Sequence, residues 1–145
     1  MEDADKAWNS PISISEVNHA IKRSKGNSAA GPDGITNAVY KTFSEFSVFV
    51  LCYLFNLFFM NGFVPFKAMS GIVMAVAKAA GGFRPITCLC NLMKLLEMII
   101  LKRIGPQLDD HLPSYQFGFR PEIGAEDQLL NFVNHLQGGG EGLQS

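Results

Sequence analysis

The sequence has few cysteines, and they match neither a disulfide framework nor a zinc knuckle. Cys52 stands alone, whereas Cys88 and Cys90 are separated by one residue, which is closer than the ligand pairs of ordinary zinc sites. Without disulfides or a structural zinc site, the fold must be stabilised by a hydrophobic core. An odd number of cysteines in a cysteine-poor chain is typical of a reducing, intracellular setting, either cytoplasmic or nuclear.

Long hydrophobic runs and targeting signals are also missing. The N-terminus is acidic and polar, unlike a signal peptide. The most apolar run, Val48–Met60, is shorter than the about 20 residues that a bilayer-crossing helix needs. We therefore expect no membrane-spanning segment, and we interpret this run as a core helix or as a helix that has lost a partner surface.

Familiar catalytic motifs are absent too. The chain contains no G-x-S-x-G, P-loop or H-E-x-x-H motif, and its three histidines are isolated from one another. Two-metal catalysis needs carboxylates gathered on rigid elements. Here Asp33 lies in a glycine-rich loop, Asp109 and Asp110 lie in an expected turn, and Asp127 begins a helix. The residues alone predict neither a metal site nor a catalytic centre.

The composition is that of a globular domain with an uneven charge distribution. The 145 residues are 48% apolar and 17% charged, which is sufficient for a real core. Over residues 21–105, ten Lys and Arg residues face three acidic ones, whereas acidic residues predominate over 1–20 and 106–145. A basic middle is compatible with a surface that faces phosphate. The alternative is an unevenly charged, solvated surface.

Hydrophobic periodicity and end signals predict a mostly helical chain. Ser13 and Glu16 form a capping-box pattern, Gly62 is typical of a helix C-terminus, and Pro106 with the preceding glycine is expected to end a helix. The predicted helices cover residues 14–24, 38–46, 47–61, 88–104 and 127–136. The last of them has an apolar face that we expect to point inward, made by Leu129, Leu130, Val133 and Leu136.

A short β-hairpin is the expected exception to the helices. Ser70–Ala77 and Phe83–Thr87 have strand composition, and the segment 79–82 between them is a glycine-containing turn. The fold class is therefore α+β, mostly helical, with a small antiparallel hairpin. Lys78 and Arg84 flank the hairpin tip, where two cations and turn amides can bracket a phosphate. The alternative is a pair of exposed charges without a ligand.

The segment Gly31-Pro32-Asp33-Gly34 has strong turn chemistry. Proline fixes one φ angle, the aspartate can close a hydrogen bond to the backbone two residues later, and Gly34 can take a positive φ. Without further context, the loop is interpreted as a connector.

Several motifs follow one another in an order that identifies a family. They are Glu16-Val17 with Ala20-Ile21, Ala29–Ile35, Leu54–Asn56, Gly62 with Pro65, Lys78, Arg84–Ile86, Lys94 with Glu97 and Arg103, Gln116–Arg120, and Asp127–Leu129. Over residues 12–136, the chain resembles the N-terminal, fingers-side part of a non-LTR (LINE-type) retrotransposon reverse transcriptase. The segment between Lys78 and Arg84 is shorter than in much of the family, which puts the register of the two cations in question.

The resemblance implies an RNA-directed DNA polymerase of right-hand architecture. By motif position, Lys78 and Arg84 would approach the triphosphate of the incoming nucleotide. The residues expected to bind the template or line its path are Gly31, Pro32, Asp33, Gly34, Gln116, Phe117, Gly118, Phe119 and Arg120. The implied partners are an RNA template and a DNA primer. Mg²⁺ is expected for the full-length family, and no cofactor is expected for this part alone.

The resemblance also predicts how the chain is organised. We expect a flexible leader over 1–11, a partial reverse transcriptase domain over 12–136, and a flexible glycine-rich tail over 137–145. The family's catalytic aspartate strands do not appear before Ser145, so we expect the palm to be missing and the chain to be inactive alone. A missing palm segment or another partner would complete it. The alternatives are a non-catalytic nucleic-acid-binding or protein-interaction module, and a relic without activity.

Overall fold

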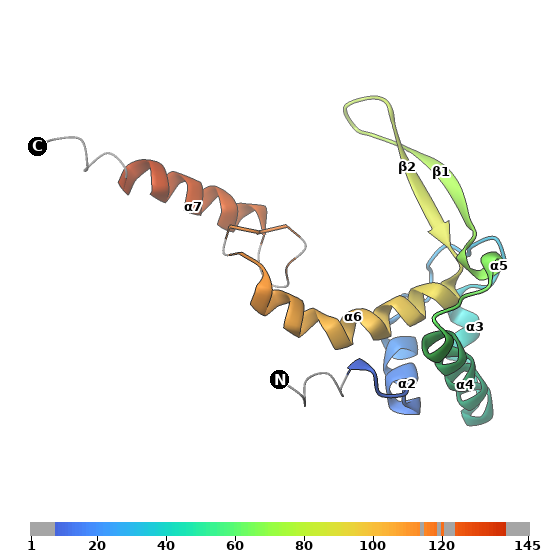
Figure 1. Cartoon of the computed structure of the whole chain (residues 1–145). Coiled ribbons are helices and arrows are strands. Elements are labelled where there is room, and N and C mark those ends of the chain that lie inside the picture. Colours follow the sequence, from blue (N-terminus) through green and yellow to red (C-terminus); the bar gives the residue numbers. More distant parts are fainter. Residues whose placement is uncertain (1–7, 114, 119, 121–123, 139–145) are drawn as a thin grey trace, which may run out of the picture. The chain divides into compact units, whose positions relative to one another are not determined.

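The computed structural model describes residues 8–113, 115–118, 120 and 124–138 (Figure 1). Within these residues, the chain combines helices with one two-stranded antiparallel sheet, as the α+β prediction requires. It divides into two compact units, Met1–Ile104 and Gly105–Ser145, which are described separately below. Part of the predicted leader and most of the predicted tail lie outside the described residues.

Helix α2, Ile14–Arg23, begins as the sequence predicts. The backbone amide of Ser13 donates to Glu16 Oε2 at 2.8 Å, and the amide of Glu16 donates to Ser13 Oγ at 3.3 Å, which completes the capping box. The apolar face of the helix, including Val17, Ala20 and Ile21, is buried. The predicted helix over 14–24 is thus confirmed to within one residue.

The next two helices divide at a different residue from the predicted one. Helix α3 is Asn37–Lys41 and α4 is Glu45–Asn61, whereas the predicted division lay between residues 46 and 47. Ser44 decides the boundary, because its Oγ accepts from the amide of Ser47 at 3.3 Å and caps α4. The predicted end at Gly62 is confirmed, and this glycine has φ 60°.

The hairpin forms with a defined register. After the short helix α5, Phe66–Met69, strand β1, Gly71–Ala77, pairs with β2, Phe83–Leu89, so that Ala77 lies opposite Phe83. At the turn, the amide of Gly81 donates to the Lys78 carbonyl at 3.1 Å and Gly81 has φ 89°. A turn followed by a left-handed residue is one of the common short hairpin connections.

Helix α6, Asn91–His111, corrects the prediction at both ends. Its start is later than residue 88, because Cys88 and Leu89 pair with β1 instead. Its end is later than 104, because the helix continues through Gly105 and Pro106. A proline inside a helix removes one amide donor, here the one that would reach the Lys102 carbonyl.

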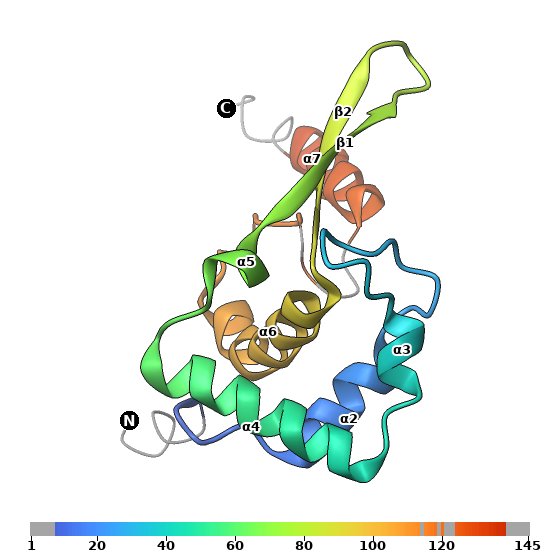
Figure 2. The same cartoon turned by 90° about the vertical axis from the view of Figure 1, so that its right-hand side faces the viewer.

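The core of the first unit lies where α2, α3, α4 and the first turns of α6 pack together (Figure 2). Phe55, Leu95 and Val17 are its largest fully buried apolar side chains. The three cysteines are all buried and free. Among the described residues, the buried side chains of this cluster are Ile12, Val17, Ala20, Ile21, Tyr40, Val48, Leu51, Cys52, Phe55, Leu95, Leu96 and Ile99.

Arg103 of α6 joins this core to the segment before α2. Its Nε donates to Glu16 Oε1 at 2.6 Å and its Nη2 donates to Glu16 Oε2 at 2.8 Å, so the two side chains form a bidentate ion pair. Its Nη1 also donates to the Ser10 carbonyl at 2.6 Å, and the guanidinium lies 5.7 Å from the centre of the Phe59 ring. Glu16 therefore serves both the capping box and this tertiary contact.

One side of α4 is buried and the other is exposed. Val48, Leu51, Cys52 and Phe55 face the core. Large apolar side chains cover the opposite side, and at least two-fifths of each is exposed: Phe46, Phe49, Val50, Tyr53, Leu57 and Met60. Of the two interpretations of this apolar helix, the structure supports an unpartnered side rather than burial all round.

The second unit contains α7, Ala125–Gly138, which extends the predicted helix at both ends. The amide of Gly124 donates to Asp127 Oδ2 at 2.7 Å just before the helix begins. The prediction that its apolar face points inward is wrong, since Leu129, Leu130 and Leu136 are each at least 60% exposed. An apolar stripe is buried only where another element supplies a matching surface.

Candidate nucleic-acid interface

The hairpin brings Lys78 and Arg84 onto the same face. Arg84 lies opposite Val76, and the amide of Lys78 donates to the Gly82 carbonyl at 3.0 Å, so Lys78 continues the ladder beyond Ala77. Because side chains alternate along a strand and cross-strand partners share a face, Lys78 and Arg84 lie on one side. The short turn therefore does not move Lys78 out of register with Arg84.

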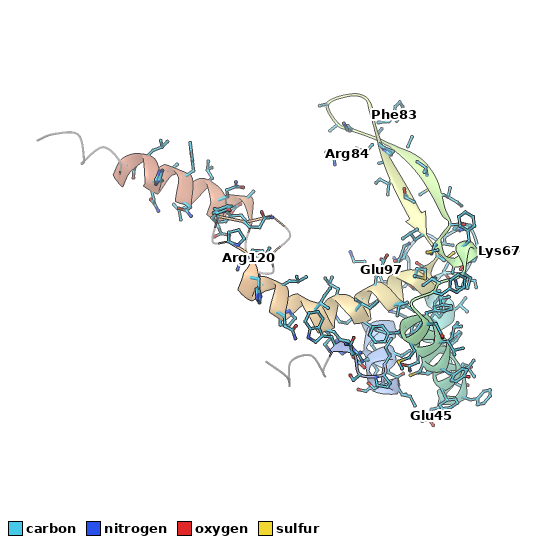
Figure 3. The ribbon with its side chains drawn as sticks, in the orientation of Figure 1. Glu45, Lys67, Phe83, Arg84, Glu97 and Arg120 are labelled. Atoms are coloured by element: carbon cyan, nitrogen blue, oxygen red, sulfur yellow. The ribbon has the colours of Figure 1, made fainter. Side chains whose placement is uncertain are left out.

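Both cations are accessible at the tip. Lys78 and Arg84 are exposed, and neither pairs with a carboxylate in the described part of the chain. Arg84 and Phe83 point to opposite sides of the hairpin near its distal end (Figure 3). Two neighbouring cations on one face suit a phosphate group. Their contact with a nucleotide triphosphate stays a prediction.

The Gly31–Gly34 loop has the turn geometry expected from its residues. The amide of Gly34 donates to the Gly31 carbonyl at 3.1 Å, and the amide of Ile35 donates to Asp33 Oδ1 at 3.2 Å. Gly34 has φ 70°, a conformation that glycine adopts at little cost. The side chain of Asp33 is thus engaged within the loop.

The loop is also anchored to the start of α6, which the sequence did not reveal. Asn91 is fully buried and its Nδ2 donates to the Ile35 carbonyl at 2.7 Å. Gly31 packs so tightly that an added Cβ would lie 2.5 Å from the backbone nitrogen of Cys90. The loop is therefore a fixed element rather than a free connector. In the sequence, this anchoring is indicated only by Gly31, which has no evident role in the turn, and by Asn91, which stands near the start of a helix.

Two buried side chains beside the loop stay protonated at neutral pH. Burial raises the pKa of Tyr40 to about 12, and the charges of Asp33 and Cys90 act in the same direction. Burial also raises the pKa of the Cys90 thiol. Neither group is therefore poised to exchange protons near pH 7.

The segment Gln116–Arg120 belongs to the second unit, and its described residues, 116–118 and 120, lie in neither a helix nor a strand. Gln116 Nε2 donates to the Gly118 carbonyl at 3.1 Å, and Arg120 Nε donates to Asp109 Oδ1 at 2.8 Å. Arg120 thus ties the segment to the last turn of α6. Phe117 is half-buried, and Phe119 lies outside the described residues. The place of this segment along a template path stays a prediction.

The described residues do not fit a catalytic Mg²⁺ site. None of their His, Cys, Asp and Glu side chains form a group of three or more that could hold a metal. Asp33 accepts a backbone hydrogen bond, and Asp109 is paired with Arg120. Among the helices of the described part, none has both the length and the apolar character to cross a membrane.

Comparisons with known proteins show sequence similarity to a group of polymerases. No protein-family model matches the chain. It is 27% identical over 132 residues to the RNA-directed DNA polymerase from mobile element jockey of Drosophila funebris, covering 86% of this chain and 14% of that protein. It is 26% identical to the probable RNA-directed DNA polymerase from transposon BS of Drosophila melanogaster, covering 87% and 15% respectively.

A third relative is the retrovirus-related Pol polyprotein from type-1 retrotransposable element R1 of Bradysia coprophila. It is 28% identical, with 87% of this chain and 13% of that protein covered. The chain therefore spans only a small part of the length of each of these relatives. Its homologues are polymerases and a Pol polyprotein of non-LTR retrotransposons, which confirms the resemblance predicted from the ordered motifs.

Proposed function

We propose that the chain supplies template and incoming-nucleotide binding, as the fingers-like part, to an RNA-directed DNA polymerase of a retrotransposon. The observation that carries the proposal is the similarity to such polymerases over 86–87% of the chain. The structural observation that fits it is the hairpin, because the two cations singled out by the motifs share one exposed face. Residues 12–136 would form this part of the polymerase.

In this proposal, Lys78 and Arg84 bind the triphosphate of the incoming nucleotide. The arginine guanidinium offers two parallel donors to phosphate oxygens, and the lysine adds a mobile point charge. A two-stranded hairpin is marginally stable alone. Contact with the nucleotide would therefore also help to order its tip.

The Gly31–Gly34 loop would contact the template through its open side. Gly31 faces Cys90, whereas a Cβ added to Gly34 would meet nothing within 4 Å. The backbone around Gly34 can therefore be approached closely by a strand. Because Asn91 already holds the loop, binding would cost little ordering entropy. In the same proposal, the template–primer path is lined by Gln116, Phe117, Gly118, Phe119 and Arg120.

The metal ions of catalysis would be bound elsewhere in the polymerase, in its palm. The chain alone should therefore fail to extend a DNA primer on an RNA template with either Mg²⁺ or Mn²⁺. Template-dependent incorporation by the purified chain would overturn this part of the proposal. A relative of full length, assayed in parallel, is the positive control.

Nucleotide binding tests the hairpin directly. We expect Lys78→Gln and Arg84→Gln each to weaken binding of a fluorescent deoxynucleoside triphosphate, by about 10-fold for the arginine. The matched control is Lys67→Gln, which removes an exposed cation of α5 in the same unit. An equal loss of nucleotide affinity in all three variants would indicate a general charge effect. It would contradict the proposal that the hairpin binds the nucleotide.

A second candidate function is a protein-interaction module, favoured by the exposed apolar side of α4. Exposed apolar patches of this kind mark surfaces that pack against another polypeptide. The rest of a polymerase, including its palm, would be one such polypeptide. Replacing Tyr53 and Met60 by serine should then raise the solubility of the isolated chain without changing its RNA affinity.

A further inference from the structure

The outer edge of β1 is open along its whole length. Within the described residues, the sheet consists of β1 and β2, so each strand is paired on one side. Every residue of β1 is exposed, and the hairpin extends away from the helices of the first unit (Figure 1). Such an edge presents backbone amides and carbonyls that can pair with a further strand.

The hydrogen bond at the turn shows which residues of β1 direct their backbone groups to this edge. The amide of Lys78 donates to the Gly82 carbonyl at 3.0 Å. Because backbone groups alternate in direction along an antiparallel strand, Val76 and Met74 direct theirs towards β2, as Lys78 does. The intervening residues therefore direct their amides and carbonyls outward. These outward-directed residues are Gly71, Val73, Ala75 and Ala77.

The outer edge of β2 is less suited to pairing, because it carries a proline. Pro85 lies opposite Ala75, so its backbone nitrogen is on the outer side of β2, and a proline nitrogen has no hydrogen to donate. Arg84 adds a charge to the same strand. In contrast, β1 contains neither a proline nor a charged residue. A further strand is therefore expected to pair with β1.

The edge of β1 is complementary to itself. When two copies pair antiparallel about a two-fold axis at Met74, Gly71 lies opposite Ala77 and Val73 lies opposite Ala75. Every outward-directed residue of one copy then faces an outward-directed residue of the other. A shift by two residues in either direction leaves Gly71 or Ala77 opposite a residue outside the strand. The length of β1 thus selects one register.

Charge favours this antiparallel arrangement over a parallel one. Lys78 directly follows β1 and is exposed. Antiparallel pairing places the Lys78 residues of the two copies at opposite ends of the sheet, roughly 25 Å apart along the strands. Parallel pairing would bring them side by side, where like charges are destabilising.

We propose that two copies of this chain pair through the outer edges of β1, antiparallel and centred on Met74. The two hairpins then form one four-stranded sheet. A second copy is the partner because its β1 matches this edge in length, register and charge. Three or more strands are needed for a sheet that is stable by itself, so the pairing also stabilises each hairpin. The inference goes beyond the proposed function and does not depend on nucleotide binding.

Apolar side chains add to the backbone pairing. Ile72 lies opposite Val76 of the second copy, and the two Met74 side chains meet at the axis. These side chains are 43–47% exposed in the single chain, so part of their surface is free to be covered. A single pair of strands nevertheless covers less than the about 800 Å² per partner of a standard interface. We therefore expect a weak dimer, with a dissociation constant on the order of 10–100 μM.

Disulfide cross-linking tests the register. Met74→Cys places two thiols at the axis, where opposite Cα atoms about 4.5 Å apart are within reach of a disulfide. The matched control is Val76→Cys, because Val76 lies on the same face and has the same 43% exposure as Met74. Its two copies would be roughly 14 Å apart along the strands. Both variants also carry Cys88→Ser, which removes the native thiol of this face.

Non-reducing electrophoresis after mild oxidation, at about 50 μM chain, measures the cross-linked fraction. We expect at least about fivefold more covalent dimer for Met74→Cys than for Val76→Cys, because only position 74 meets itself in the proposed register. Equal cross-linking at the two positions would indicate random collision and would overturn the proposed register.

Sedimentation equilibrium tests the edge without a cross-link. Ala75→Lys places a cation on the outer edge of β1 and should raise the dissociation constant of the dimer at least about tenfold. Thr87→Lys is the matched control, since Thr87 is an exposed residue of β2 on the same face as Ala75. It should leave the dissociation constant within about threefold of the wild-type value.

Two results would overturn the proposal. The first is a wild-type chain that stays monomeric up to about 200 μM, well above the expected dissociation constant. The second is a dimer that both lysine variants preserve, which would indicate another interface such as the exposed apolar side of α4. Neither result bears on the nucleotide-binding assay of the hairpin tip, so failure here leaves the proposed function standing.

Discussion

The pair of Glu16 and Arg103 predicts a specific loss of stability in acid. The pKa of Glu16 is lowered from 4.5 to about 2, chiefly because its carboxylate accepts hydrogen bonds from Arg103. At about 1.4 kcal/mol for each tenfold change in proton affinity, the ionised form stabilises the fold by up to about 3 kcal/mol. The Glu16 side chain is 26% exposed. Screening by water therefore reduces this to about 1–3 kcal/mol.

The direction of the pH dependence follows from the lowered pKa. Because the folded chain holds this proton less tightly than the unfolded chain, the stabilisation is complete above pH 4.5 and is lost as the pH falls towards 2. Glu16→Gln keeps the size of the side chain and removes its charge. We expect the variant to lose about 1–3 kcal/mol at pH 7 and to differ progressively less from the wild type below pH 4.5.

Urea unfolding followed by far-UV circular dichroism at pH 7, 5, 4 and 3 measures this difference. Glu97→Gln is the matched control, since Glu97 is an exposed carboxylate of α6 outside both ion pairs of the described residues. Glu97→Gln should change the free energy of unfolding by no more than about 0.5 kcal/mol at every pH. A difference between Glu16→Gln and wild type that stays constant from pH 7 to pH 3 would refute the reasoning.

Two further predictions concern the anchored loop, and both are measured by urea unfolding at pH 7. Gly31→Ala should lower the free energy of unfolding by at least about 2 kcal/mol, because the new Cβ requires the Cys90 backbone to move. The control is Gly26→Ala, whose Cβ meets no atom within 4 Å and which should leave the stability nearly unchanged. Equal effects of the two substitutions would show that the close approach is not rigid. Asn91→Ala should cost about 1–3 kcal/mol, because it leaves the Ile35 carbonyl without its 2.7 Å hydrogen bond. It should also speed amide exchange in the loop, and unchanged exchange would mean that the loop is held by other contacts.

Features that depend on neighbouring residues could be predicted from the sequence. The capping box of Ser13, the end of α4 at Gly62 and the Asx bond of Asp33 all close within a few residues. The hairpin is local as well, because the turn after Lys78 sets its register. The position of Lys78 and Arg84 on one face could thus be predicted from the motif spacing once the turn was defined.

Features that depend on distant partners needed the tertiary structure. Arg103 has a clear helical position in the sequence, but its pairing with Glu16 joins residues 87 positions apart. The apolar stripe of α7 shows which face would be buried, and only the structure shows that Leu129 and Leu136 are exposed. Pro106 disfavours a helix locally, yet the turns on either side of it continue α6.

The sequence by itself determined the order of the elements, the turn chemistry and the motifs that link the chain to retrotransposon polymerases. These rest on local hydrogen bonding and on the spacing of residue types. Only the tertiary structure showed that Asn91 fixes the Gly31–Gly34 loop. Burial and hydrogen-bond satisfaction are set by segments brought together from across the chain, so neither can be read from a local pattern.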